Sequence, residues 1–164
     1  MQKYIKLTDE YLDKFLEVKY PQEIFEAMRY SVLAPGKRLR PVMCLEACRI
    51  FDGNIEDAIP TACAIEMLHA QSLIHDDLPC MDNDDYRRGK LTNHKVFGEA
   101  IAVLAGDALI SFAPQLIIRQ SKNLDEKTKL RLVEEYCVAA GAYGLIAGQV
   151  VDIQSEGKNI SPET

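Results

Sequence analysis

The sequence predicts an all-α fold, a helical bundle formed by a single domain. Long apolar segments recur with the spacing of amphipathic helices, and short loops containing Gly or Pro separate them. No run alternates apolar and polar residues as a half-buried strand would, and no repeat or low-complexity linker divides the chain. With 164 residues, 48% of them hydrophobic, the chain can bury the core of one domain. Bundles of this kind place their sites between facing helices, although the pattern leaves the topology open.

Proline and glycine residues set the limits of the expected helices. A first helix ends at Pro21, and one of its faces carries Leu12, Phe15, Leu16 and Lys19. The other expected helices cover roughly residues 22–31, 41–51, 60–78, 99–121 and 125–154. Pro41 suits the first turn of the third helix, and Pro79 ends the fourth. Pro114 predicts a kink in the fifth helix, and Gly157 closes the last.

Composition and charge narrow the functional classes. The net charge of −6 argues against a general nucleic-acid binder, so the basic run 87–90 is interpreted as a local anion site. No apolar run approaches the roughly 20 residues that a bilayer span needs. Residues 1–6 lack the apolar region of a signal peptide. We therefore expect a cytoplasmic protein without a membrane span.

The five cysteines form no CxxC pair and are odd in number. This favours free thiols that behave as small buried apolar side chains in a reducing cytosol. Cys44 and Cys48 lie one turn apart on an expected helix, so a metal face with two thiol ligands is the alternative interpretation.

The most informative segment, residues 75–89, combines acidic and basic side chains. Five aspartates and two adjacent arginines fall within thirteen residues. Carboxylates at this density need a counter-charge, and Mg²⁺ supplies one when one or two carboxylates, waters and substrate phosphates bind it. The neighbouring arginines offer planar forks that suit phosphate oxygens. The segment therefore predicts a site for Mg²⁺ and a diphosphate.

Spacing suggests which of these carboxylates face the metal. His69 and Asp76 are seven residues apart, so they share one face of the long helix. Asp76 and Asp82 could both turn toward metal ions because the chain bends between them. A solvated acidic loop that caps the helix is the alternative. An EF-hand is excluded, because Arg87 and Asn93 occupy the positions where that loop needs glycine and glutamate.

Two further segments add polar groups. Residues 36–41 begin with a glycine that lets the backbone approach a ligand, and three cations follow within four residues. Lys37 and Arg40 could converge on one anion, with Arg38 directed elsewhere. The alternative is a basic helix start on the surface, although cations oppose the helix dipole at that end. Residues 148–152 end the last helix with a polar pair, Gln149 and Asp152, which alone would be a weak signal.

Together these segments resemble the short-chain trans-isoprenyl diphosphate synthases, the farnesyl and geranylgeranyl diphosphate synthases. The resemblance runs from about Tyr30 to Gly157 in the order and spacing of that family. It is carried by residues 36–41, 66–69, Asp76-Asp77 with Asp82, 87–89, 92–99, 104–109 and Gly148-Gln149 with Asp152. It implies the helical bundle of the isoprenoid synthases.

The resemblance also assigns roles. By analogy with the family, Asp76 and Asp82 would hold Mg²⁺ that bridges an allylic diphosphate (dimethylallyl, geranyl or farnesyl), and Asp77 would help. Arg87 would contact the same diphosphate, and Gln149 would lie near it and near the developing cation. The pocket for isopentenyl diphosphate would be formed by Lys37, Arg40, His69 and Arg88. The implied reaction is Mg²⁺-dependent condensation of isopentenyl diphosphate with the allylic diphosphate, which releases diphosphate. The family is usually homodimeric, so a homodimer is expected.

Two departures from the family pattern matter. The second aspartate-rich motif and the Lys-Thr pair of the family do not appear before Thr164, so residues 1–164 are expected to be the N-terminal portion of one isoprenoid synthase domain. Alone, the chain is expected to be inactive or nearly so. The positions that line the floor of the product pocket are Gln71 and Ser72, neither of them aromatic, and Pro79-Cys80 is inserted in the acidic motif. Farnesyl (C15) and geranylgeranyl (C20) products therefore both remain open.

Two other functions compete with this interpretation. One is a non-catalytic subunit that regulates a prenyl synthase, although such proteins usually lose the acidic motif. The other is a class I terpene cyclase, which shares the fold and an aspartate motif. Residues 36–41 and Arg88 would have no purpose in a cyclase, because a cyclase need not bind isopentenyl diphosphate.

Overall fold

The computed structural model describes residues 1–158, and nearly all of its regular structure is helical. The helices are α1 (Gln2–Phe15), α2 (Gln22–Val32), α3 (Leu39–Ile50), α4 (Ile55–Asp76), α5 (Asn93–Phe97), α6 (Glu99–Gln120), α7 (Glu126–Ala140) and α8 (Leu145–Ser155). A two-stranded hairpin, β1 (Tyr86–Arg87) and β2 (Lys90–Leu91), lies between α4 and α5. The all-α prediction is confirmed. The expected end of the domain at Thr164 lies outside the described residues.

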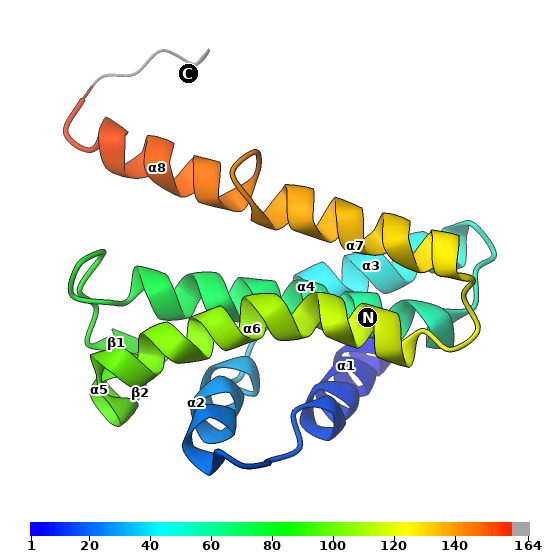
Figure 1. The fold of residues 1–164 in the computed structure, drawn as a ribbon, viewed down its shortest axis with the longest axis horizontal. Helices are drawn as coiled ribbons and strands as arrows, with labels where there is room; N and C mark the ends of the chain where they lie inside the picture. The colour runs from blue at the N-terminus through cyan, green and yellow to red at the C-terminus, as the bar shows by residue number, and fades with distance from the viewer. Residues whose placement is uncertain (159–164) are drawn as a thin grey trace.

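Helices α4 and α6 form the centre of the bundle and run side by side (Figure 1). Met67 and Ile74 of α4 are buried against the same core as Leu109 and Ile117 of α6. Burial of side chains of this size stabilises the fold by roughly 1.5–3 kcal/mol each. Helices α1, α2 and α3 pack around this pair, and α7 covers α6 from the other side. The loops that follow α2 and α4 therefore meet at one end of a rigid helix pair.

The closest approach of α4 to α6 depends on a glycine. A Cβ atom at Gly106 would overlap the ring of His75, whose Nε2 lies 3.2 Å from the carbonyl oxygen of Val103. The other ring nitrogen, Nδ1, lies 3.0 Å from Gln71 Nε2. His75 therefore joins the two central helices.

The boundaries of three helices differ from the prediction. Helix α1 ends at Phe15, before Pro21, so Lys19 lies outside it. Helix α4 begins at Ile55, five residues before Pro60, because the Asn54 side chain accepts a hydrogen bond from the Glu56 amide at 3.1 Å and caps it. The single helix expected over 125–154 is two helices separated at residues 141–144. The break follows from Gly144, whose backbone is not helical and whose Cβ, if present, would overlap the carbonyl oxygen of Ala139.

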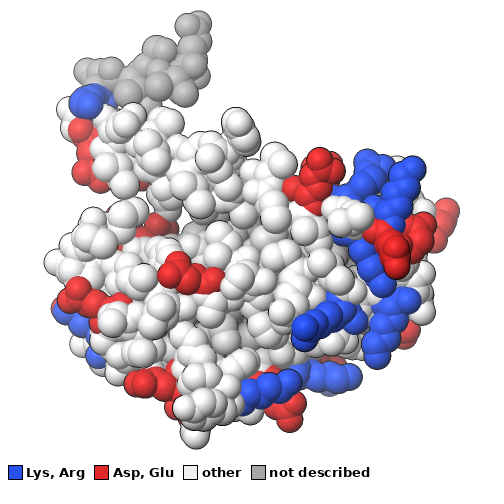
Figure 2. Space-filling model, viewed as in Figure 1, with Lys and Arg blue, Asp and Glu red and all other residues white. Residues whose placement is uncertain are grey.

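Helix α8 differs from the rest of the bundle. It follows α7 along the top of Figure 1, contacts α7 and has no buried residue. Its exposed apolar side chains are Ile146, Val150, Val151 and Ile153. The space-filling view shows that Lys and Arg gather near the junction of α6 and α7, whereas most of the same face is uncharged (Figure 2).

The prediction that no segment could span a membrane is not confirmed. By length and composition alone, α6 and the segment Glu126–Ser155 are long and apolar enough to do so. Helix α6 packs against α4, α2 and α7, and the core helix of a soluble protein passes the same criterion.

Candidate functional site

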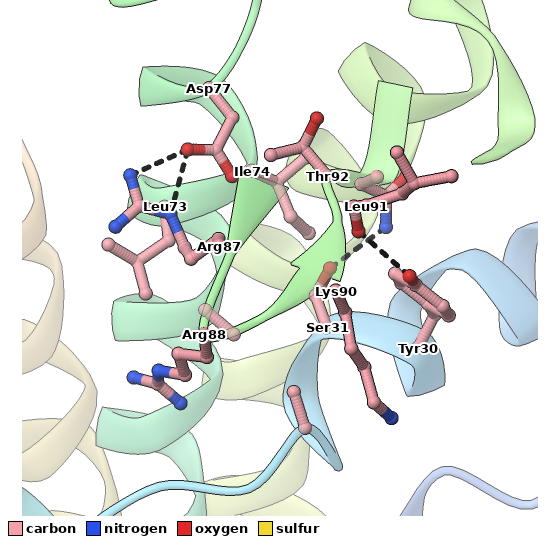
Figure 3. A pocket seen from close by; sticks show the side chains of 13 residues that line it. Tyr30, Ser31, Leu73, Ile74, Asp77, Arg87, Arg88, Lys90, Leu91 and Thr92 are labelled. Carbon is pink, nitrogen blue, oxygen red and sulfur yellow. Dashed lines mark hydrogen bonds and ion pairs between the residues drawn. The ribbon is translucent and has the colours of Figure 1, made fainter. Parts of the chain in front are cut away.

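The acidic and basic side chains of the site are placed by the loop and hairpin that follow α4. The helix ends at Asp76, and residues 77–85 lead into β1. Arg88 and Gly89 form the hairpin turn with φ values of 53° and 78°. This left-handed turn sends the neighbouring Arg87 and Arg88 side chains in different directions, as Figure 3 shows.

Asp76 and Asp82 come together because the loop folds back on the end of α4. The amide of Asp82 donates a hydrogen bond of 2.8 Å to the carbonyl oxygen of Asp76. Burial raises the pKa of Asp76, and the charge of Asp82 raises it further. The side-chain amide of Gln149, from α8, donates a hydrogen bond to Asp76 Oδ1. The two predicted metal-facing carboxylates and Gln149 therefore lie together, although the chain separates them widely.

Asp77 has a different environment from the other two aspartates. The residue is 3% exposed, and its Oδ1 accepts a hydrogen bond of 2.7 Å from Arg87 Nε (Figure 3). Arg87 Nη2 forms an ion pair with the same oxygen at 2.6 Å. The hydrogen bond to Asp77 raises the pKa of Arg87. The structure therefore pairs Asp77 with Arg87, which does not support the expectation that Asp77 binds a metal. Nη1 of Arg87 has no bonded partner within residues 1–158.

The carboxylates present fit a hard divalent cation. Asp76 and Asp82 supply oxygen ligands, and their mutual repulsion, visible in the raised pKa of Asp76, is the feature that a bound cation would relieve. Within the described part of the chain, no three His, Cys, Asp or Glu side chains are grouped to hold an ion. Two carboxylates with waters and a bound phosphate suffice for Mg²⁺, whereas Zn²⁺ or Ca²⁺ would need more protein ligands.

The cations expected to bind a second anion line one open cavity of about 540 Å³. Lys37 and Arg40 reach it from the start of α3, His69 from α4, and Arg88 from the hairpin. Arg88 Nη1 donates a hydrogen bond of 3.1 Å to the carbonyl oxygen of Pro35, and Nη2 lies 3.5 Å from His69 Nε2. We call this group of residues the basic pocket. The sequence prediction placed these four side chains in one site, and the structure brings them together.

Gly36 leaves room for Arg88 in the basic pocket. A Cβ atom at position 36 would lie 2.7 Å from Arg88 Nη1, too close for an unshifted contact. Since the obstructing atom is the end of a flexible side chain, a methyl group there would displace the guanidinium and leave the fold intact. The glycine was predicted to let the backbone approach a ligand, and in this structure the group that approaches it is Arg88.

His69 is held mainly in its neutral form. Burial lowers its pKa, and the charges of Arg40 and Arg88 lower it further, partly opposed by Glu66. The side chain is therefore surrounded by positive charge that a bound anion would neutralise.

Arg38 points away from the cations on either side of it. It takes a left-handed conformation, with φ of 47°, at the N-cap of α3, and its side chain is 4% exposed. Nε donates to Asp9 at 2.7 Å, Nη1 donates to Glu66 at 2.8 Å, and Nη2 donates to the carbonyl oxygen of Ala34 at 3.1 Å. Sequence reasoning directed Arg38 elsewhere but missed both carboxylates. The position of Glu66, three residues before His69 on α4, was the available signal for one of them.

The hairpin is fastened to α2 at its other end. Tyr30 donates a hydrogen bond of 2.8 Å to the carbonyl oxygen of Leu91 (Figure 3). At the start of α5, Asn93 Nδ2 donates to the Ala27 carbonyl oxygen at 2.8 Å and to Ser31 Oγ at 2.9 Å. A small cavity of about 40 Å³ lies behind these contacts. The hairpin is therefore held between α2 and Asp77, which fixes where both arginines begin.

Gln71 and Ser72, the expected floor of a product pocket, are both buried on α4. Ser72 donates a hydrogen bond of 3.0 Å to the carbonyl oxygen of His69. Gln71 contacts the His75 ring, which in turn contacts α6. Cys44 and Cys48 are partly buried free thiols next to an apolar cavity between α3, α4 and α7.

Comparison with known proteins relates this geometry to a family. A family model described as polyprenyl synthetase matches residues 21–164. The chain is 56% identical to a chloroplastic geranylgeranyl pyrophosphate synthase of Catharanthus roseus, over 89% of this chain and 41% of that protein. It is 49% identical to a farnesyl diphosphate synthase of Geobacillus stearothermophilus, over 92% and 51%.

A solved structure described as a geranyltransferase from Legionella pneumophila superposes with a TM-score of 0.94 at 35% identity. The superposition covers 99% of this chain and 58% of that one. The chain therefore spans about half the length of the relatives that it matches.

Proposed function

The chain belongs to the polyprenyl synthetase family, and on this premise we propose that it carries the two diphosphate sites of a Mg²⁺-dependent prenyltransferase. The acidic end of α4 would take an allylic diphosphate with Mg²⁺, and the basic pocket would take isopentenyl diphosphate. The product would be farnesyl or geranylgeranyl diphosphate, in keeping with the names of the relatives.

The observation that carries this proposal is the placement of Arg87 and Arg88. These adjacent residues belong to two sites of opposite character, since Arg87 pairs with Asp77 beside Asp76, and Arg88 lies beside His69 in the basic pocket. A hydrolase of one diphosphate would need only the first site. Two anion sites joined through neighbouring residues suit a reaction that joins two diphosphate esters.

The residues of the acidic end would bind the allylic substrate and stabilise its leaving group. Asp76 and Asp82 would hold Mg²⁺, which supplies Lewis-acid stabilisation of the charge on the departing diphosphate. Arg87 would offer its free Nη1 to the same oxygens while Asp77 holds its other nitrogens. Gln149, already bonded to Asp76, would orient that carboxylate and lie near the developing cation.

The residues of the basic pocket would bind and orient the second substrate. Lys37, Arg40 and Arg88 would hold its diphosphate, and neutral His69 could donate a hydrogen bond without adding charge. The double bond of isopentenyl diphosphate would then form a bond to the allylic carbon as the carbon–oxygen bond breaks. The proton lost in this step would pass to the released diphosphate, so no side chain needs to act as a nucleophile.

The assembly and location of the protein are part of this proposal. A homodimer and a cytoplasmic location follow from the family resemblance and from the composition. Size-exclusion chromatography with light scattering would measure the first, and microscopy of a tagged chain would measure the second.

Calorimetry with inorganic diphosphate tests the two-site proposal directly. We expect one site that requires Mg²⁺ and one that does not. Asp76→Ala should remove only the Mg²⁺-dependent site, and Lys37→Ala with Arg40→Ala should remove only the other. A single site, or binding indifferent to Mg²⁺, would contradict the proposal. Because residues 1–164 alone are expected to be inactive, prenyl transfer from dimethylallyl diphosphate would be followed in a longer chain that includes the second aspartate-rich motif of the family. Two-site binding without turnover by that longer chain is the result expected of a regulatory subunit.

A further inference from the structure

Helix α1 lies outside residues 21–164, which match the family model, yet one of its side chains reaches the wall of the basic pocket. Asp9 Oδ1 accepts a hydrogen bond of 2.7 Å from Nε of Arg38. The Asp9 side chain is 49% exposed, whereas the Arg38 side chain is 3% exposed. The contact therefore joins a surface residue of α1 to a buried arginine of the pocket.

Arg38 matters to the pocket because of Glu66. The Glu66 carboxylate lines the same cavity as Lys37, Arg40 and Arg88, and it is only 4% exposed. An uncompensated carboxylate there would repel a bound anion and would be costly to bury. Arg38 Nη1, at 2.8 Å, supplies the compensating charge. The pocket can attract a diphosphate only while this pair is kept together.

The backbone of Arg38 also separates its neighbours. Its left-handed conformation turns this side chain inward, so the side chains of Lys37 and Arg40 are left exposed in the pocket. A non-glycine residue keeps a φ of 47° only where its surroundings hold it. Here the three hydrogen bonds of the Arg38 guanidinium hold it. Asp9 supplies one of the three.

We propose that Asp9 is a positioning residue for the basic pocket, which holds Arg38 against Glu66 and thereby keeps Lys37 and Arg40 directed at a bound diphosphate. The inference rests on the proposed function of this pocket. It adds a residue that does not touch substrate and that stands on a helix outside the family match. It assigns to α1 a part in anion binding as well as in the core.

Asp13 offers a matched control. It lies one turn after Asp9 on α1, is similarly exposed, and pairs with an arginine of its own, Arg29 of α2. Asp9→Asn and Asp13→Asn remove the same charge from the same helix. If only the overall field mattered, both changes would tighten anion binding slightly, because each removes a negative charge.

The test is calorimetry with inorganic diphosphate on the wild-type chain and both variants, with and without Mg²⁺. We expect Asp9→Asn to weaken the Mg²⁺-independent site about fivefold or more, because Asn offers Arg38 only an uncharged acceptor. Asp9→Ala should weaken it at least as much, because Ala offers no acceptor. The Mg²⁺-dependent site should keep its affinity in every variant, and Asp13→Asn should match the wild type. Chemical denaturation would establish that each variant is folded under the assay conditions.

The possible outcomes separate the two proposals. Equal affinities for Asp9→Asn and Asp13→Asn at the Mg²⁺-independent site would overturn the role of Asp9 and leave the proposed function standing. Equal weakening of both sites by Asp9→Asn would also overturn it, because that pattern indicates general destabilisation. Absence of any diphosphate binding to the wild type would overturn the proposed function and this inference with it.

Discussion

The acidic end of α4 and the basic pocket sit on the two sides of one hairpin, but they differ in how far their charges are balanced. In the basic pocket, the buried Glu66 is paired with Arg38, and Arg88 is held by the Pro35 carbonyl oxygen. At the acidic end, the pKa of Asp76 is raised by burial and by the charge of Asp82. The side chains of the basic pocket are held in place before an anion binds, whereas a bound cation would favour the ionised form of Asp76 at the acidic end.

Because of this difference, the affinities of the two sites should depend on different kinds of residue. A preorganised pocket binds its ligand without first reorganising side chains, so its affinity should depend on the residues that hold the cations in place. A pair of repelling carboxylates should bind an anion only through a metal, so its affinity should depend on the ligands themselves. Substitutions at supporting and at ligating positions test the two cases separately.

The largest predicted effect is a loss of stability when the buried ion pair of Arg38 and Glu66 in the basic pocket is broken. Arg38→Met leaves Glu66 buried without a partner, and we expect a loss of about 3–5 kcal/mol in the free energy of unfolding. Urea denaturation measures this loss. The double variant Arg38→Met with Glu66→Gln should recover much of it, since no uncompensated charge remains. A single variant as stable as the wild type would show that the pair does not hold the pocket together.

The next effect concerns the acidic end alone. Asp76→Ala should weaken Mg²⁺-dependent binding of diphosphate about 100-fold, because loss of a metal ligand costs several kcal/mol. The basic pocket should be unaffected, which calorimetry without Mg²⁺ would establish. Asp85→Ala is a suitable control, because Asp85 pairs with Lys95 away from Asp76. Equal losses for both substitutions would mean that only total negative charge matters.

A smaller effect should show whether anion binding depends on the position of Arg88 as well as on the charge of the basic pocket. Gly36→Ala adds no charge, but its methyl group would displace Arg88 from the Pro35 carbonyl oxygen. We expect Mg²⁺-independent affinity for diphosphate to fall about fivefold, the loss of one charge-assisted hydrogen bond. The unfolding midpoint should change little, because the displaced group is the end of a flexible side chain. An unchanged affinity would count against a preorganised Arg88.

The smallest effect is a shift in the titration of His69. Its pKa in the folded protein lies below the ordinary value of about 6.5, because burial and the charges of Arg40 and Arg88 disfavour the imidazolium. Bound diphosphate supplies the opposite charge, so this pKa should rise. Proton uptake on binding should therefore occur below neutral pH, between the free and bound values. Histidine NMR titration with and without diphosphate measures the shift, and no shift would place the anion elsewhere.

Much of this site was predictable from the order of residues along the chain. The family resemblance implied that Lys37, Arg40, His69 and Arg88 share one pocket, and in the structure all four line one cavity. The pairing of Asp77 with Arg87 was not predictable. Spacing cannot tell which of two adjacent carboxylates will be buried beside an arginine ten residues further along.

The helix boundaries were also predicted only in part. The expected helix over 99–121 agrees with α6, but the first helix ends at Phe15, before Pro21. The start of α4 was placed too late, because Pro60 was given more weight than the capping residue Asn54. The break between α7 and α8 was missed, since the apolar pattern continues through residues 141–144. The close contact that requires Gly144 involves backbone atoms, which leave no trace in an apolar pattern.

The adjacency of Arg87 and Arg88 has a consequence for the length of the hairpin. Consecutive Cα atoms are about 3.8 Å apart, whatever their side chains do. Two anions held by neighbouring residues therefore have a separation set by covalent geometry and by the turn at Arg88 and Gly89. Under the proposed function, a residue inserted between the arginines would leave every charge in place and would still change the distance between the two bound diphosphates. The alignment of the two proposed substrates would then depend on the number of residues in the hairpin, which point substitutions cannot alter.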